Sequence, residues 1–444
     1  MPWKNQTRST AAFRRGRRTL RLLVAGLTAA LATTFAVTPA SPTANESGRH
    51  RSQTDTYVAT WDAVGQRAFT AAALSPAEGH VLFGYAGIAV YDAVMSVRHN
   101  YEPFAIRTHA PRGASPEAAV VAAAHRIYEY YLPAQQDTIL DPAYDTSLAT
   151  IRDGQSKLDG VAAGLRVANA FIALRADDGF REDVGYTPPD PAVPGNWVPT
   201  AATSPLGTYL GKMKPLGLDS ADQFRPGGPP QLGSRRWARE YNEVKEIGSR
   251  TSTTRKEWQT TAAQFWAEAP VQQAHLALRG VIEQRELDVV QAARMMAMVS
   301  VAYADGIIAC FDAKYAYEFW RPITAIHNGD KDGNEATVVD PNWIHLLGGT
   351  PNHPDYPSAH SCITPAGGAA LAEFLGTRRI NLTMHSLTGL GDRHFETVRE
   401  LTKEVGEARI WGGIHFRSAV DDGIRVARRT AAEVLDGNFE RTRR

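Results

Sequence analysis

The sequence predicts an all-α fold in which helical bundles are joined by long loops. Apolar residues recur at three- and four-residue spacing along most of the 444-residue chain, whereas the alternating pattern of β-strands is scarce. The composition, 43% hydrophobic and 21% charged, is that of a folded globular protein. A proline- and glycine-rich segment in mid-chain separates two helical parts, as expected for bundles with long decorated loops.

The first 44 residues are typical of an export signal peptide, and residues 45–444 are expected to form a single α-helical domain. Seven basic residues lie before an uncharged, mostly apolar stretch at residues 22–37, and small residues follow that stretch. This order is that of a cleaved signal, and the stretch is short for a membrane span. Arg17-Arg18 leaves open whether export follows the twin-arginine or the general secretory route. We therefore expect a secreted or extracytoplasmic protein.

The charge balance gives no support to a nucleic-acid partner. Without residues 1–44 the chain has 41 basic against 47 acidic residues, a net charge of −6. The most apolar later segment, residues 292–311, is interrupted by Arg294 and Asp305, so we expect no membrane span in the mature chain. The sequence leaves the oligomeric state open, a homodimer included.

The helical pattern falls into three consecutive parts. The N-terminal helices, within residues 45–182, are expected near residues 55–72, 79–97, 116–132 and 157–177. The third begins at Ser115-Pro116, a serine N-cap with proline in the first turn. A Pro/Gly-rich covering segment spans residues 183–253 and includes one helix over 234–248. The C-terminal helical bundle, which we take as the catalytic part, spans residues 254–436, with helical periodicity over 254–320, 365–376, 392–408 and 416–436.

A loop in the C-terminal bundle reads "PDYPSAHS" over residues 354–361 and places a serine two residues before a histidine. Thr364 is expected to cap a fresh helix with Pro365 at its first position. The preceding turn, Ser358 to Ile363, would then direct its amides toward an anion. Cys310 and Cys362 could pair in an exported protein or remain two buried thiols.

Two cations precede this loop and a third follows it. Lys314 and Arg321 lie seven residues apart, close to two helical turns, and are expected on one face of a helix that ends at Pro322. Such cations repel each other unless an anion lies between them, although two surface cations would also fit the pattern. Arg409 and His415 lie six residues apart and could converge because Gly412-Gly413 lets the chain turn; the alternative is a helix C-cap followed by a core histidine.

Together these pieces supply the donors that a phosphate-like oxyanion requires, namely three cations, a hydroxyl, backbone amides and two histidines. A unit charge pair at ~4 Å and an effective dielectric constant near 20 contributes about 4 kcal/mol gross. Three cations can therefore hold an anion despite its desolvation cost, whereas one could not.

The ordered set Lys314-x6-Arg321-Pro322, Pro357-Ser358-Ala359-His360 and Arg409-x5-His415 resembles a known signature. It is that of the superfamily joining vanadium-dependent haloperoxidases to type 2 phosphatidic acid phosphatases and bacterial acid phosphatases. Flanking segments over about residues 255–425 resemble the exported bacterial haloperoxidase branch. The resemblance implies an all-α fold with the oxyanion bound at one end of the C-terminal bundle.

The haloperoxidase resemblance implies a vanadate cofactor, with hydrogen peroxide, halide and an organic acceptor as the reacting partners. His415 would be the axial ligand, His360 would act as acid and base, and Lys314 would polarise the peroxide. The residues expected to hold the vanadate oxygens are Lys314, Arg321, Ser358, Ala359 and Arg409. His353, seven residues before His360, resembles the histidine of bromide-using members and is a candidate halide-site residue; a histidine in a proline-rich turn is the plainer interpretation.

Two other functions fit the same residues. In a soluble exported acid phosphatase, His415 would be the nucleophile that becomes phosphohistidine, and His360 would protonate the leaving alcohol. A non-catalytic oxyanion-binding homologue is suggested by two departures from the family pattern. Ala359 replaces a glycine, and Ala419 stands where many members carry an aspartate, so that Asp421 or Asp422 is expected to orient His415.

Overall fold

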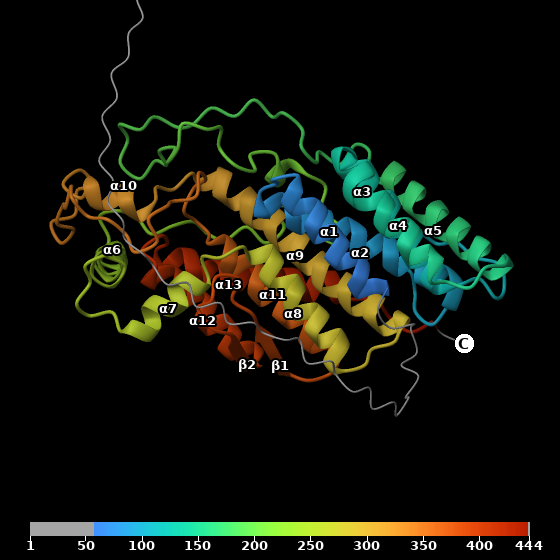
Figure 1. The fold of residues 1–444 in the computed structure, drawn as a ribbon. Helices are drawn as coiled ribbons and strands as arrows, with labels where there is room; N and C mark the ends of the chain where they lie inside the picture. The colour runs from blue at the N-terminus through green and yellow to red at the C-terminus, as the bar shows by residue number, and fades with distance from the viewer. Residues whose placement is uncertain (1–56, 443–444) are drawn as a thin grey trace, which may run out of the picture. The chain divides into compact units, whose positions relative to one another are not determined.

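The computed structural model describes residues 57–442 and confirms the all-α prediction (Figure 1). The predicted signal at residues 1–44 lies outside the described residues. The α-helices are α1 (Tyr57–Ala71), α2 (Pro76–Arg98), α3 (Pro116–Tyr131), α4 (Asp141–Ala149), α5 (Gln155–Leu174), α6 (Arg235–Ile247), α7 (Glu257–Phe265), α8 (Pro270–Gln284), α9 (Val289–Tyr317), α10 (Pro322–His327), α11 (Ala359–Leu375), α12 (Val398–Trp411) and α13 (Arg417–Leu435). Two strands, β1 (Arg379–Met384) and β2 (Arg393–Thr397), pair antiparallel.

Helix α9 is the central element of the C-terminal bundle and packs against α2, α11 and α13. Asp288 caps it by accepting a hydrogen bond from the amide of Gln291, and most of the residues of the helix are buried. Helices α2 and α9 are long and apolar enough to cross a membrane, but 89% and 100% of their most apolar windows are buried inside the protein. Both are core helices here.

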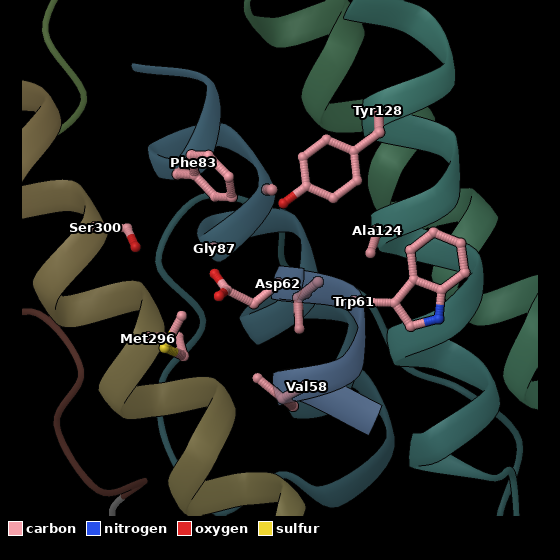
Figure 2. Close-up of a pocket in the computed structure, with 11 residues that line it drawn as sticks. Val58, Trp61, Asp62, Phe83, Gly87, Ala124, Tyr128, Met296 and Ser300 are labelled. Atoms are coloured by element: carbon pink, nitrogen blue, oxygen red, sulfur yellow. The ribbon is translucent and has the colours of Figure 1, made fainter. Parts of the chain in front are cut away.

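The N-terminal helices α1, α3 and α5 pack around α2. Between α1, α2, α3 and α9 lies a small cavity of about 30 Å³, lined by Asp62, Tyr128 and Ser300 among others (Figure 2). The Asp62 carboxylate pairs with His275 Nδ1 at 2.6 Å and with the guanidinium of Arg279. This buried acid is therefore already neutralised within the protein.

The proline- and glycine-rich segment between α5 and α6 is ordered because core side chains bind its backbone. Asp305 of α9 accepts hydrogen bonds from the amides of three consecutive residues, Leu216 to Leu218, at 2.7–2.9 Å. Further along, the amide of Trp197 donates to the carbonyl of Glu318 at 2.6 Å. The segment thus lies over the C-terminal end of α9, close to the cations predicted to bind an anion.

The prediction that Lys314 and Arg321 share one helix face is wrong. Helix α9 ends at Tyr317, and Glu318 takes a left-handed conformation with φ 45°. Arg321 is instead the N-cap of α10, in which Pro322 is the first residue. A proline fits the first turn of a helix as well as it ends one, so the chain turns between the two cations.

Several helix boundaries in the C-terminal bundle differ from those predicted. Helix α11 begins at Ala359 and continues through Pro365, so Thr364 does not cap a separate helix. The helix expected over 392–408 begins only at Val398, after β2, where Thr397 forms a capping box with Glu400. The strands, α4 and α10 were not predicted. Both cysteines are free and buried.

Candidate active site

The segment that carries Ser358 is fixed against α13. The amide of Ser358 donates to the carbonyl of Ala419 at 2.8 Å, and the Tyr356 hydroxyl donates to Asp422 Oδ2 at 2.6 Å. Gly423 permits this close approach, since a Cβ there would lie 2.9 Å from the carbonyl oxygen of Ser358. The serine therefore has a defined position at the start of α11.

Ser358 is the N-cap of α11, but its side chain makes no capping hydrogen bond. Its Oγ is buried and has no partner among the described residues. The first amides of a helix also lack intrahelical partners, so hydroxyl and amides at this helix start are available to an anion. Ala359 is not among the residues with positive φ, and its methyl group therefore causes no backbone strain.

The three predicted cations are buried, each with a relative exposure of 3% or less. Lys314 Nζ donates to the carbonyls of Pro354 and Asp355 at 2.7 and 3.0 Å. The Arg321 guanidinium donates through Nε to the carbonyl of His353 at 2.8 Å. Arg409 donates one hydrogen bond, to the carbonyl of Trp266 at 2.6 Å, and its buried Nε has no partner within residues 57–442.

Positive charge is in excess at this site. The carboxylate whose charge acts on both Lys314 and Arg321 is Asp355, which is itself paired with His415. Within residues 57–442 none of the three cations forms a salt bridge. Burial lowers the pKa of all three, of Lys314 to about 8, and the charge of Arg321 lowers the pKa of Lys314 and Arg409 further. A bound anion would oppose this shift.

Asp355 orients His415, so the expectation that Asp421 or Asp422 does so is wrong. His415 Nδ1 lies 2.8 Å from Asp355 Oδ1, and both side chains are buried. The other nitrogen, Nε2, faces a guanidinium nitrogen of Arg321 at 3.3 Å. Because a guanidinium only donates, Nε2 must carry the lone pair and Nδ1 the proton. Burial raises the pKa of Asp355 to about 7, while Arg321 and Lys314 oppose the shift.

The two other histidines lie in the same site. His360 Nε2 is enclosed without a partner among the described residues, and burial together with Arg409 holds the pKa of this imidazole well below its usual range. His353 is buried, 3.0 Å from an Arg321 nitrogen through Nδ1, and its ring centroid lies 5.1 Å from that of Phe311. All three histidines line a cavity of about 540 Å³, which we call the site cavity.

The residues present fit a tetrahedral oxyanion. Unpartnered donors remain on Ser358 and Arg409, an unpartnered nitrogen remains on His360, and the positive charges exceed the negative ones. A buried polar group without a partner costs roughly 1–3 kcal/mol, so an anion that satisfies several of them would bind favourably. The described residues contain no group of three or more acids, histidines or cysteines placed to hold a metal ion.

Several known proteins resemble this chain in sequence or in fold. Residues 294–441 match the family model of the VCPO second helical-bundle domain. Vanadium chloroperoxidase from Curvularia inaequalis is 24% identical over 256 residues, which cover 46% of this chain and 41% of that protein. This chain thus matches less than half the length of that relative.

Two solved structures share the fold. A bacterial vanadium-dependent iodoperoxidase superimposes with a TM-score of 0.75 at 23% identity, covering 88% of this chain and 98% of that chain. An apo-type bacterial vanadium-dependent chloroperoxidase gives a TM-score of 0.65 at 17% identity, covering 82% and 94%. The resemblance to vanadium-dependent haloperoxidases, first seen in three short motifs, is confirmed and extends in fold over most of the chain.

The sequence interpretation missed Asp355 even though this residue stands inside "PDYPSAHS". An acid three residues before the serine was a usable signal, because the same loop that presents Ser358 must also pass close to His415. Ala419, where family members often carry the acid, directed attention to the wrong end of the site.

Proposed function

We propose that this protein is a vanadate-dependent haloperoxidase that uses hydrogen peroxide to oxidise a halide and halogenate an organic acceptor. The observation that carries the proposal is the cluster of three buried cations, none in a salt bridge within residues 57–442, around His415, whose Nε2 presents its lone pair toward Arg321. The likeness to vanadium haloperoxidases supports vanadate over phosphate as the resident anion.

The residues that would hold vanadate are His415, through Nε2, together with Lys314, Arg321, Arg409, Ser358 and the amide of Ala359. Bound vanadate would supply a Lewis-acid centre that activates peroxide without changing its own oxidation state. Asp355 keeps the lone pair of His415 directed into the site by holding the proton on Nδ1. The three cations neutralise the anion and withdraw charge from its oxygens.

His360 is proposed to move the proton of the entering peroxide. Its low pKa leaves the imidazole neutral, and a neutral imidazole can accept a proton through the unpartnered Nε2. The nearby charge of Arg409 then favours return of that proton, so the group can act as base and as acid in one cycle. His353, held against Arg321, is the proposed contact for the halide.

The test incubates vanadate-free protein with orthovanadate, peroxide and bromide plus a halogen acceptor, and in parallel with a phosphate ester. We expect halogenation that requires vanadate and no ester hydrolysis. Ester hydrolysis that vanadate inhibits would instead identify a phosphatase with His415 as nucleophile. Tight vanadate binding with neither activity would identify a non-catalytic homologue.

We also propose that the enzyme acts outside the cytoplasm. This proposal rests on the signal-like composition of residues 1–44. N-terminal sequencing of the protein recovered from the culture medium or periplasm tests it, with a start just after the small residues that end the signal as the expected result.

A further inference from the structure

The site cavity extends well beyond the anion site. Its volume of about 540 Å³ is in the range of pockets that enclose organic molecules, and far larger than a halide or peroxide requires. It is lined by His360, Arg409 and His415 and also by residues of the first turns of α2. The space between them adjoins the place where the proposed chemistry occurs.

The wall formed by α2 presents His80 to this cavity. The imidazole is 1% exposed, and neither ring nitrogen has a partner among the described residues. Its ring packs against Tyr303 with centroids 5.2 Å apart, which fixes its orientation. Burial lowers the pKa of His80 to about 3, so the side chain is neutral and offers one N–H donor and one bare nitrogen.

The rest of the wall is mainly apolar. Ile307, Phe311 and Ile363 project from α9 and α11, and Leu206 and Leu347 come from the loops. Glu268 also borders the cavity, but its carboxylate oxygens accept hydrogen bonds from the hydroxyls of Ser386 and Thr388 and from the Leu387 amide. The free polar contact on this side is therefore the imidazole of His80.

We propose that the site cavity binds the organic acceptor itself, and that the acceptor is an apolar molecule with a hydroxyl group, such as a phenol, whose hydroxyl pairs with His80. A neutral imidazole satisfies a neutral hydroxyl, whereas a carboxylate beside His80 would find no cation on the first turns of α2 and an amine would be repelled by Arg409, which lines the same cavity. An aromatic ring suits the apolar walls and, in phenols, is electron-rich enough to react with an electrophilic halogen. That the bound molecule is halogenated rests on the proposed function; that it binds does not.

The experiment measures binding of 2-naphthol and of 2-methylnaphthalene to the vanadate-free protein by fluorescence titration. The two probes differ by a hydroxyl in place of a methyl group. In the unmodified protein we expect 2-naphthol to bind more tightly, and His80→Leu to weaken it about tenfold while 2-methylnaphthalene is unaffected. His80→Gln, which keeps a donor and an acceptor, is the matched control and should restore most of the preference.

Three results would overturn the proposal: neither probe binds the unmodified protein, His80→Leu leaves the affinity for 2-naphthol unchanged, or 2-naphthol is not preferred. If His80→Leu fails to fold, His80→Phe takes its place, because it keeps an aromatic ring against Tyr303 and removes both nitrogens; a lost preference for 2-naphthol in that variant supports the proposal and a retained one contradicts it. Vanadate titration of the same preparations separates the two hypotheses. Vanadate binding without 2-naphthol binding refutes the acceptor site alone, and the reverse pattern refutes the haloperoxidase assignment alone.

Discussion

Two sets of buried charges in this protein are treated in opposite ways. The carboxylates of Asp92 and Asp305 each accept hydrogen bonds from three consecutive backbone amides, which compensate their burial. Lys314 and Arg409 are equally buried, yet they are left without acids and, for Arg409, with an unpartnered nitrogen. The two carboxylates hold loops onto the core, whereas the two cations have the unmet charge expected of an anion-binding site.

Removing one of the carboxylates that bind three amides should lower the stability of the protein more than any other change proposed below. Asp305→Ala would leave three buried amides, those of Leu216 to Leu218, without an acceptor, and we expect the free energy of unfolding to fall by about 4 kcal/mol. Urea denaturation measures this change. Asp222→Ala, at an exposed acid whose ion pair with Arg225 spans 3.9 Å, is the control and should change stability by less than about 0.5 kcal/mol. A small effect of Asp305→Ala would mean that the loop is held by other contacts.

The unsatisfied cations should behave in the reverse manner. Arg409→Met is expected to weaken vanadate binding about 100-fold, or about 3 kcal/mol, without destabilising the vanadate-free protein, because it removes charge that nothing in the site balances. Calorimetric titration and urea denaturation of the same preparation report the two quantities. Arg225→Met, at an arginine paired with Asp312, should leave vanadate affinity unchanged. Marked destabilisation by Arg409→Met with unaltered vanadate binding would place Arg409 among the structural charges.

Asp355 combines features of the two sets. It is a buried acid like Asp305, but it positions His415, a residue of the proposed anion site. Asp355→Asn is expected to lower vanadate affinity by roughly 10-fold, since the amide can no longer enforce the Nδ1–H tautomer of His415. Nitrogen NMR of the labelled imidazole distinguishes this effect from a general loss of structure, because it reports which ring nitrogen carries the proton. A tautomer that is unchanged in the variant would contradict the positioning role.

The pKa of Lys314 sets a pH limit on the site. Burial lowers it to about 8 from an ordinary value of 10.5, so between these values the unfolded chain holds a proton that the folded protein has lost. Stability contributed by this group therefore rises with pH across that window. Vanadate affinity should fall as pH rises above about 8, because the free site then loses a cation. Lys314→Met should show a weaker decline, and comparison of the two proteins cancels the protonation of vanadate itself.

Ala359 stands where the family pattern has a glycine, and its replacement should change vanadate affinity least. Since Ala359 takes no positive φ, Ala359→Gly should change vanadate affinity less than about threefold and lower stability by about 0.5–1 kcal/mol through backbone entropy. The same titration and denaturation experiments apply. A gain of tenfold or more in affinity would show that the Ala359 methyl group hinders the anion.

Local signals predicted much of the fold. The start of α3 at Pro116 followed from a serine cap and a first-turn proline, and the sequence places both side by side. The end of α9 did not follow, because Pro322 begins the next helix and Glu318 adopts a left-handed conformation without a glycine to signal it. The start of α12 was recognisable in principle from Thr397 and Glu400, but helical periodicity ran through β2 and hid it.

The site was predictable to the extent that its residues lie in short motifs. Lys314, Ser358 and Arg409 were proposed from residue type and spacing. Lys314 lies on α9 as expected, whereas Arg321 lies beyond its end, at the N-cap of α10. No local sequence signal marks His80 as a cavity residue. It stands in an apolar core helix, more than 200 residues before the Lys314, Ser358 and Arg409 motifs in the sequence. Only the packing of α2 against α9 brings it to the cavity wall.

We infer that the buried cations form an oxyanion site, and a crystal structure of the protein grown with orthovanadate would show the anion in place. We predict anomalous density for vanadium bonded to His415 Nε2, with its oxygens within hydrogen-bonding distance of Ser358 Oγ and Arg409 Nε. Vanadate bound elsewhere, or absent from this site at concentrations that support halogenation, would contradict the claim.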